Sequence, residues 1–388
     1  MKKAKPTFST TGALSDYCAV SPGGKEGRLS TFERMTLTEG EELERALTRI
    51  AKQFEEISLD PGKLRPSFGA PDIEYLKHAA EFYGSWTDKR SEFFVTPELP
   101  NVSKNAVHGL WDGEIFDISF LSSFEARFPG YATRYGAFER NRMVHARMWR
   151  HRLPPRATIF AIHGWTMGDQ RINSLAFLPG VFYKAGFDVV LIELPFHGRR
   201  SSPDAADSNL FPTTDVILTN EAIAQAISDL RALRLYTDSD RKSSTGWLGV
   251  SLGAYVGALW SGLDEHDFAV PIVPLTSMFE PAWEVLSQNP LFRQFKKDGL
   301  TPGMLKDIYS IHTPLNCVPK VKRGASFIIG GLGDKMVPPK QVKLLFDHWK
   351  SVDAVIKWYR GGHAASLKRT KAFADIETFL EQIVPRRS

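Results

Sequence analysis

The stretch Gly249-Val250-Ser251-Leu252-Gly253 stands between a short apolar run and a series of small residues. The apolar run at 245–248 predicts a buried strand, and the small residues at 254–258 predict a helix with a close-packing face. A Gly-x-Ser-x-Gly sequence between a strand and a helix is typical of a tight turn that lifts the serine hydroxyl clear of the sheet. Gly249 and Gly253 leave room for the backbone to cross itself there. The pattern predicts that Ser251 is a nucleophile.

A serine becomes a nucleophile only beside a base, and the base needs a third group to hold its ring. Asp334 follows the apolar segment 325–329 in a Gly-rich run, and His363 follows the apolar segment 354–359. Both candidates therefore come after strand-like segments, and open α/β sheets bind ligands at the carboxyl ends of their strands. Serine, acid and histidine in this chain order predict a catalytic triad.

An oxyanion hole is the fourth expected element. The strand-like segment 158–162 runs directly into His163-Gly164-Trp165. We expect the backbone N–H groups of Trp165 and Leu252 to bind the oxyanion, an effect worth about 3–4 kcal/mol per donor in another hydrolase. His163 is predicted to be a structural histidine below this loop, and His197 a turn histidine that bonds its own loop.

A second carboxylate competes with Asp334 for the place of the triad acid. Glu280 follows the next apolar strand, 269–276, and some relatives of this kind of sheet carry the acid there. Asp334 is favoured because of its Gly-rich approach and its place on the penultimate strand. Glu280 remains the alternative.

These four motifs, in this order, resemble the α/β-hydrolase superfamily, and the resemblance covers about residues 101–388. It implies an α/β fold with a mostly parallel, eight-stranded sheet and helices on both faces. It also implies that Ser251, Asp334 and His363 are the catalytic residues. One segment departs from the family pattern, because Glu193 stands where many members carry an aspartate followed by a Gly-rich turn.

The chain before residue 101 is predicted to be an N-terminal extension, partly helical. A capping box at Thr38 to Glu41 and apolar residues recurring through 43–57 predict one helix. Pro71 opens a second helix, whose apolar face carries Ile73, Leu76, Ala80 and Tyr83. We expect both helices to pack on the body of the protein, with a lid or a dimer contact as the alternative.

Two further patterns lie within the body. The alternating segments 114–124 and 142–151 predict the antiparallel strands that open it. The segment at about 279–323, inserted between two predicted strands, predicts a helical cap over Ser251. Its aromatic residues either pack the insertion onto the body or line an apolar acyl or aryl pocket, for which the candidates are Phe279, Trp283 and Phe292.

Composition limits the class of protein. The 388 residues carry 49 Lys and Arg against 44 Asp and Glu, and the two signs are interspersed, which argues against a nucleic-acid surface. No apolar run is long enough to span a membrane and the first residues do not form a secretion signal, so a cytoplasmic protein is expected. Cys18 and Cys317 suit a reducing compartment, and neither they nor the histidines have metal-site spacing. No metal and no cofactor are expected.

The sequence as a whole predicts a serine hydrolase that cleaves a small-molecule carboxylic ester or thioester through an acyl-enzyme on Ser251. The same residues also suit acyl transfer or amide hydrolysis, and the sequence does not separate these reactions. A hypothesis from another class is a non-catalytic binding protein that keeps the fold. The oligomeric state stays open, with a homo-oligomer among the alternatives.

Overall fold

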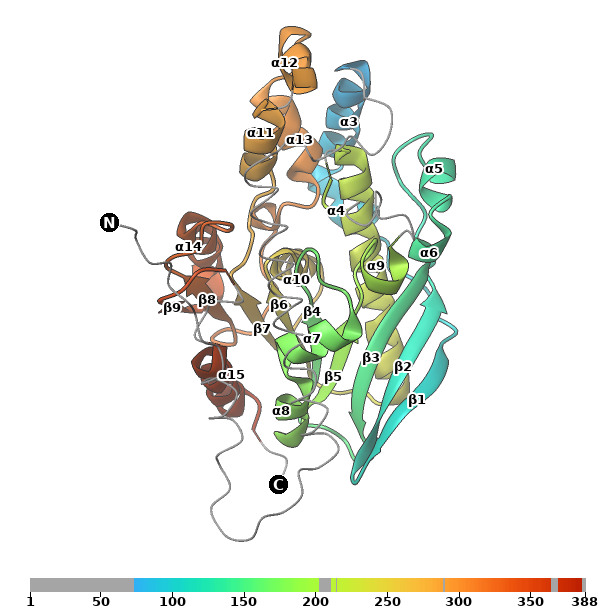
Figure 1. The fold of residues 1–388 in the computed structure, drawn as a ribbon, viewed down its shortest axis with the longest axis vertical. Helices are drawn as coiled ribbons and strands as arrows, with labels where there is room; N and C mark the ends of the chain where they lie inside the picture. Colours follow the sequence, from blue (N-terminus) through green and yellow to red (C-terminus); the bar gives the residue numbers. More distant parts are fainter. Residues whose placement is uncertain (1–72, 202–210, 214, 289, 364–368, 386–388) are drawn as a thin grey trace, which may run out of the picture. The chain divides into compact units, whose positions relative to one another are not determined.

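Short runs of β-branched and aromatic residues form the strands of one sheet. The computed structural model describes residues 73–201, 211–213, 215–288, 290–363 and 369–385, and within them nine strands pair in the order β1-β2-β3-β5-β4-β6-β7-β8-β9 (Figure 1). In chain order the strands are β1 Ser103–Leu110, β2 Gly113–Leu121, β3 Met143–His151, β4 Thr158–Ile162, β5 Asp188–Ile192, β6 Thr245–Val250, β7 Phe268–Ile272, β8 Phe327–Gly331 and β9 Val355–Tyr359. The predicted helix at 43–57, its capping box and Cys18 lie outside the described residues.

The sheet is antiparallel at one end and parallel over the rest. Strands β1, β2 and β3 alternate in direction, and β3 is antiparallel to β5. From β5 through β4, β6, β7 and β8 to β9 all pairings are parallel. Strands β4 to β8 are buried along their whole length, as expected when helices cover both faces of a parallel sheet.

The expectation of eight strands was wrong by one edge strand. The segments expected as the opening antiparallel strands are β2 and β3, but β1 precedes them and pairs with β2 across a turn at Trp111 and Asp112. Strand β1 is exposed along seven of its eight residues. Its sequence, SKNAVHGL, has no apolar face to bury, so it lacks the alternation by which a strand is identified.

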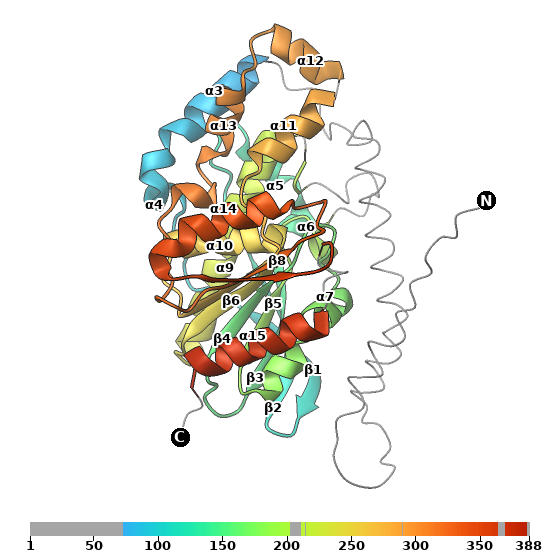
Figure 2. The same ribbon diagram turned by 90° about the vertical axis from the view of Figure 1, so that its left-hand side faces the viewer.

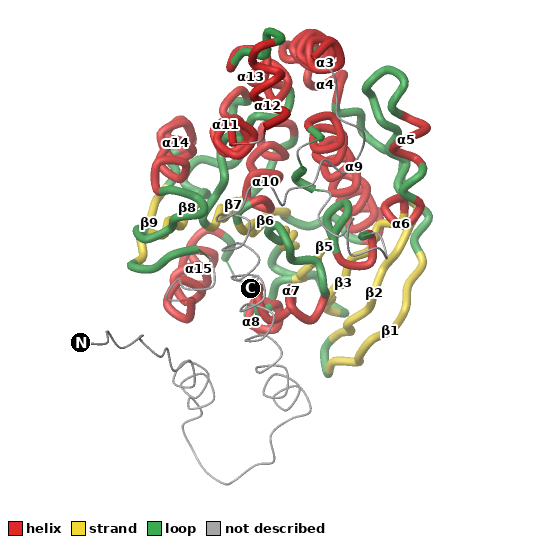
Figure 3. The backbone as a smooth tube through the Cα atoms, turned by 45° about the horizontal axis from the view of Figure 1, so that its top comes forward, coloured by secondary structure: helices red, strands yellow, loops and turns green. Residues whose placement is uncertain are grey.

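Helices cover both faces of the sheet (Figure 3). One face is covered by α9 (Val216–Asp240), α10 (Leu252–Leu263) and α14 (Pro339–Trp349). The other is covered by α7 (Gln170–Phe177), α8 (Pro179–Lys184) and α15 (Arg369–Ile383). Two short helices, α5 (Ala132–Gly136) and α6 (Glu139–Arg142), lie between β2 and β3 in the chain. This arrangement is the doubly wound α/β architecture that was predicted.

The small residues at the start of α10 bring that helix close to the sheet. A Cβ atom on Gly257 would lie 2.5 Å from the ring of Trp247 on β6, so only glycine permits this approach. Trp247 is fully buried, and its indole N–H donates to the Ser261 hydroxyl of α10 at 2.9 Å. The strand and helix that flank Ser251 are therefore packed tightly against each other.

The insertion between β7 and β8 is helical, as predicted. It contains α11 (Phe279–Gln288), α12 (Pro290–Lys297) and α13 (Pro302–Ser310). Helix α3 (Ile73–Ser85) lies alongside α13, and Leu76, Ala80 and Tyr83 are buried on one face as the sequence indicated (Figure 2).

The segment after α3 fastens the end of α13. Thr87 and Ser310 share a hydroxyl hydrogen bond at 2.6 Å. The guanidinium of Arg90, the first residue of α4 (Arg90–Phe93), donates to the backbone carbonyls of Ser310 at 2.9 Å and Ile311 at 3.1 Å. The N-terminal segment thus contacts the insertion directly, which the sequence did not indicate.

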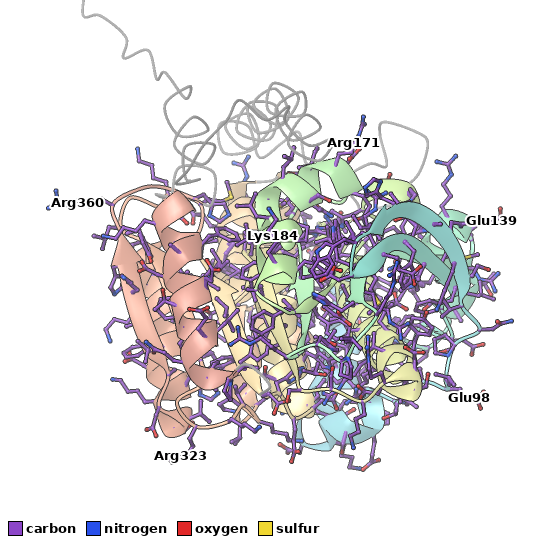
Figure 4. All side chains as sticks on the ribbon, turned by 90° about the horizontal axis from the view of Figure 1, so that it is seen from below. Glu98, Glu139, Arg171, Lys184, Arg323 and Arg360 are labelled. Atoms are coloured by element: carbon purple, nitrogen blue, oxygen red, sulfur yellow. The ribbon has the colours of Figure 1, made fainter. Side chains whose placement is uncertain are left out.

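Charged side chains of both signs lie around the periphery of the molecule when it is seen from below (Figure 4). Among the labelled residues, Glu139, Arg171 and Arg323 point away from the sheet. This agrees with the interspersed charges in the sequence. Within the described residues, no helix is both long enough and apolar enough to cross a membrane.

Candidate active site

Ser251 stands on a strained turn between β6 and α10. Its backbone has φ 55° and ψ −112°, a conformation that residues with a side chain rarely adopt. A Cβ atom on Gly249 would lie 2.6 Å from the Gly253 carbonyl oxygen, and one on Gly253 would overlap the Ile162 carbonyl oxygen. The Ser251 N–H donates to the Ile272 carbonyl of β7 at 2.9 Å and so fixes the turn to the next strand. The local geometry is that of the predicted turn.

Asp334 and His363 meet on the loops that follow β8 and β9. His363 Nδ1 lies 2.7 Å from Asp334 Oδ2. The other oxygen, Oδ1, accepts hydrogen bonds from the backbone N–H groups of Met336 and Val337, both at 2.9 Å. The Asp334 side chain is fully buried. Its carboxylate therefore has a fixed orientation, with one oxygen held by the backbone and one directed at the imidazole.

The glycines around Asp334 permit this meeting of two loops. A Cβ atom on Gly331 would lie 2.6 Å from the Gly362 carbonyl oxygen, and the Gly333 N–H donates to the Gly361 carbonyl at 2.7 Å. The two backbones are thus in direct contact. Ser251 follows β6, at the same edge of the sheet, and β6 and β8 are separated only by β7, which corresponds to about 10 Å.

The loop after β4 passes beside Ser251. A Cβ atom on Gly164 would lie 3.6 Å from the Ser251 Cβ atom and 3.3 Å from the Val250 carbonyl oxygen. Trp165 is the next residue of this loop, and Leu252 is the first residue of α10, where an N–H group has no acceptor within the helix. The two segments predicted to supply the oxyanion donors therefore meet at Ser251.

Comparison with known sequences finds relatives of this chain among uncharacterized proteins. No family model matches the chain. The chain is 30% identical over 314 residues to the uncharacterized protein Rv2627c of Mycobacterium tuberculosis strain H37Rv, which covers 78% of this chain and 73% of that protein. The uncharacterized protein MT2702 of strain CDC 1551 matches to the same extent.

Two solved structures share the fold. An acetyl xylan esterase from Paenibacillus sp. R4 has a TM-score of 0.55 at 16% identity, over 77% of this chain and 94% of that one. Acetyl xylan esterase 1 from Thermoanaerobacterium sp. JW/SL YS485 has a TM-score of 0.53 at 16% identity, over 81% and 99%. The chain therefore has the fold of these α/β-hydrolase esterases. The chain belongs to one family with the two mycobacterial proteins.

Two histidines near the site hydrogen-bond to the backbone of their own loops or of a neighbouring loop, as expected of structural residues. His163 donates from Nδ1 to the Gly164 carbonyl at 2.8 Å and accepts at Nε2 from the Leu194 N–H at 3.0 Å. Burial lowers its pKa well below the ordinary value, so the ring is neutral. His197 donates to the Pro195 carbonyl at 2.8 Å, and burial lowers its pKa to about 4. At neutral pH neither ring is in its charged imidazolium form.

Glu193, the departure from the family pattern, is an anchor for the loop after β5. Its buried carboxylate accepts from the Gln170 side chain at 3.1 Å and from the Arg199 backbone N–H and side chain, both at 2.9 Å. It thereby joins this loop to α7. Burial raises the pKa of Glu193 although these donors oppose the shift.

Glu280, the alternative triad acid, is not the carboxylate that contacts His363. Glu280 is exposed in the first turn of α11, whereas the carboxylate against the His363 ring belongs to Asp334.

Cys317 is a buried free thiol. Among the described residues, no three His, Cys, Asp or Glu side chains gather where they could hold a metal ion.

The candidate pocket residues are on the insertion. Phe279 and Trp283 are half-buried on α11, with ring centroids 6.1 Å apart. Lys306 Nζ lies 5.0 Å from the centroid of Phe279, and Lys296 Nζ lies 4.6 Å from that of Trp283. Both rings thus pack against side chains of the insertion itself. Phe292 lies on α12, and its side chain is not among those described.

Proposed function

We propose that this α/β-hydrolase is a serine hydrolase of carboxylic esters or thioesters, with Ser251 as nucleophile, His363 as base and Asp334 as the acid that orients it. The observation that carries the proposal is the 2.7 Å hydrogen bond between His363 and a fully buried Asp334, at the same sheet edge as the strained Ser251. A serine at such a turn together with an oriented imidazole supports acyl transfer chemistry.

The contacts of Asp334 assign the tautomer of His363. Because the backbone of Met336 and Val337 holds Oδ1, Oδ2 is left to accept a proton shared with His363 Nδ1. With the hydrogen on Nδ1, the Nε2 atom carries the lone pair and accepts the proton of Ser251. Asp334 also stabilises the imidazolium that results.

The reaction follows in two halves. Ser251 Oγ attacks the acyl carbon while His363 Nε2 takes its proton, and the N–H groups of Trp165 and Leu252 bind the negative oxygen that forms. His363 then returns the proton to the leaving alcohol or thiol as the acyl-enzyme forms. A water molecule gives a proton to His363 and attacks the acyl carbon, and His363 then returns a proton to Ser251 Oγ as the carboxylic acid leaves.

The same acyl-enzyme also serves acyl transfer, when an alcohol or amine replaces the water, and amide hydrolysis. The products separate these reactions. We place ester or thioester hydrolysis first because it needs only the groups already described. Of the candidate pocket residues, Phe279 and Trp283 would then line the acyl side from the insertion.

A fluorophosphonate probe tests the nucleophile. We expect one adduct, located on Ser251 by mass spectrometry, because the turn and its base activate one serine among many. Ser251→Ala should give no adduct and no turnover of nitrophenyl esters, and Ser351→Ala, in an exposed turn, should react like the wild type. An adduct on another serine, or none on folded wild-type protein, would contradict the assignment.

A panel of nitrophenyl esters of rising chain length, run beside acyl-CoA thioesters, then defines the substrate. A specificity constant that depends on acyl length supports an acyl pocket under the insertion. Folded protein that reacts with no member of the panel and with no probe would instead favour the non-catalytic binding protein.

A further inference from the structure

Backbone strain gathers at one edge of the sheet. Six residues other than glycine have positive φ in the described part of the chain, and four of them follow the carboxyl ends of β4, β5, β6 and β7: Thr166, Phe196, Ser251 and Val273. Each such residue costs about 1–3 kcal/mol and persists only where its surroundings hold it. Ser251 is one of the four, so the strain lies where the proposed chemistry takes place.

Thr166 is one of two β-branched residues among these four, the other being Val273. Thr166 is the third residue of a turn closed by the Met167 N–H and the Gly164 carbonyl at 3.3 Å, and its φ is 60°. A turn with positive φ at this position favours glycine. A β-branched residue is the most costly choice there, because two substituents on Cβ crowd the backbone.

The hydroxyl of Thr166 carries a second cost. Its Oγ1 atom is shielded from solvent and has no hydrogen-bond partner among the described residues. A buried hydroxyl without a partner costs about 1–3 kcal/mol. Glycine at 166 would remove both the strain and the unsatisfied hydroxyl.

The hydroxyl groups of other buried threonines in the described part of the chain do have hydrogen-bond partners. Thr158 shares a hydrogen bond with the Ser243 hydroxyl at 2.8 Å, and Thr276 donates to the Gln341 carbonyl at 2.8 Å. Thr219 donates to the Thr213 carbonyl at 3.2 Å. Thr166 is the threonine that lacks such a partner in the described part of the chain.

The position of Thr166 indicates what the missing partner is. It follows Trp165, one of the two proposed oxyanion donors, in the loop whose Gly164 would place a Cβ atom 3.6 Å from the Ser251 Cβ atom. The hydroxyl is both a donor and an acceptor, and it is free to donate to a ligand oxygen because it has no partner among the described residues. A donor held in place before the reaction stabilises developing charge without reorganisation.

We propose that the Thr166 hydroxyl is a third oxyanion donor, which gives its hydrogen bond to the acyl oxygen beside the N–H groups of Trp165 and Leu252. This inference rests on the proposed function. It explains why the strained, unsatisfied residue stands next to the nucleophile: its hydrogen bond forms only when the negative oxygen is present.

Thr166→Val and Thr166→Ser separate the hydroxyl from the shape of the residue. Valine keeps the β-branch, the volume and the strain but removes the hydroxyl, whereas serine keeps the hydroxyl. We expect kcat for a nitrophenyl ester to fall about 100-fold in Thr166→Val, in line with the loss of one oxyanion donor, with KM changed less than about threefold. Thr166→Ser should retain kcat within about threefold. Thr166→Ala is the second hydroxyl-free variant in case valine folds poorly, and its kcat should fall likewise.

The outcomes distinguish this inference from the proposed function. If wild-type protein labels at Ser251 and turns over, but Thr166→Val keeps the wild-type kcat, the third donor is refuted and the hydrolase stands. Equal losses in the valine and serine variants would also refute it, because the effect would then follow the shape of the loop. Wild-type protein that neither labels nor turns over refutes the proposed function itself, and the third donor with it.

Discussion

Two buried polar clusters of this protein differ in how well their groups are satisfied. In the cluster between α9 and the loop after β5, the Arg200 guanidinium contacts the Asp229 carboxylate and the Asn141 carbonyl, both at 2.8 Å. Asp229 accepts a further hydrogen bond from the Ser122 hydroxyl at 2.6 Å. At the edge around Ser251, by contrast, the nucleophile is strained and the Thr166 hydroxyl has no partner among the described residues.

The contrast separates stability from function. A buried polar group whose partners all belong to the scaffold contributes order to the fold. A strained or unpaired group lowers stability and persists where a ligand completes it. We therefore expect substitutions in the Arg200 cluster to lower the free energy of unfolding and to leave turnover per folded molecule unchanged. Substitutions at the Ser251 edge should lower turnover and leave the free energy of unfolding nearly unchanged.

Asp334→Asn gives the largest effect that this comparison predicts. The amide offers a donor where the carboxylate accepted one, so His363 takes the wrong tautomer and kcat should fall about 10⁴-fold while the fold stays intact. Turnover of a nitrophenyl ester and the far-ultraviolet circular dichroism spectrum measure the two quantities. Glu280→Gln is the matched control and should leave kcat near the wild-type value. The reverse ranking would move the triad acid to α11.

The elements of the site that could be predicted from sequence are local. Three segments need a backbone conformation that only glycine permits: the turn at Ser251, the Gly-rich approach to Asp334 and the Gly-Gly pair before His363. A few adjacent residues are therefore enough to predict each of them. The buried strands of the parallel region were predictable because continuous apolar runs mark them. In the structure, Asp334 Oδ2 lies 2.7 Å from His363 Nδ1.

What could not be predicted depends on contacts between distant residues. Strand β1 has no apolar face, and its partner β2 is what makes it a strand. The ion pair of Arg200 with Asp229 joins residues 29 positions apart, and no local pattern marks either one. The unsatisfied hydroxyl of Thr166 is likewise invisible in the sequence, because whether a threonine finds a partner is decided only by packing.

Asp229→Ala should give the largest effect on stability. It leaves the fully buried Arg200 guanidinium without its carboxylate, which costs about 3–5 kcal/mol for a buried pair. Urea unfolding measures the loss, and kcat per folded molecule at low temperature should equal that of the wild type. Asp347→Ala, which breaks an exposed pair with Lys343 on α14, is the control and should leave the unfolding midpoint unchanged. A stable Asp229→Ala variant would remove the distinction between the two clusters.

Glu221 of α9 provides a smaller effect, which appears in the dependence of stability on pH. Its carboxylate accepts from the Tyr83 hydroxyl of α3 at 2.6 Å and from the backbone N–H groups of Arg127 and Phe128 at 2.7 and 3.0 Å. These donors favour the ionised form, but burial outweighs them and raises the pKa of Glu221 to about 7.

The sign of the effect follows from the direction of this shift. Because the pKa is higher in the folded protein than in the unfolded chain, folding favours the protonated carboxyl group. Its contribution is fully present below about pH 4.5 and is lost as the pH rises to about 7, the pKa of Glu221 in the folded protein, and the loss amounts to about 3 kcal/mol.

Glu221→Gln removes this titration, and comparing it with the wild type isolates the contribution. Urea unfolding of both proteins from pH 4.5 to 8 should show that the wild type loses stability relative to the variant as the pH rises, with the change complete near pH 8. Glu81→Gln, at an exposed position of α3, should follow the wild-type curve. Parallel curves for the wild type and Glu221→Gln would mean that the carboxylate stays ionised throughout. Since Tyr83 joins α3 to α9 through this group, the pH dependence reports the attachment of the N-terminal segment, and kcat per folded molecule should not follow it.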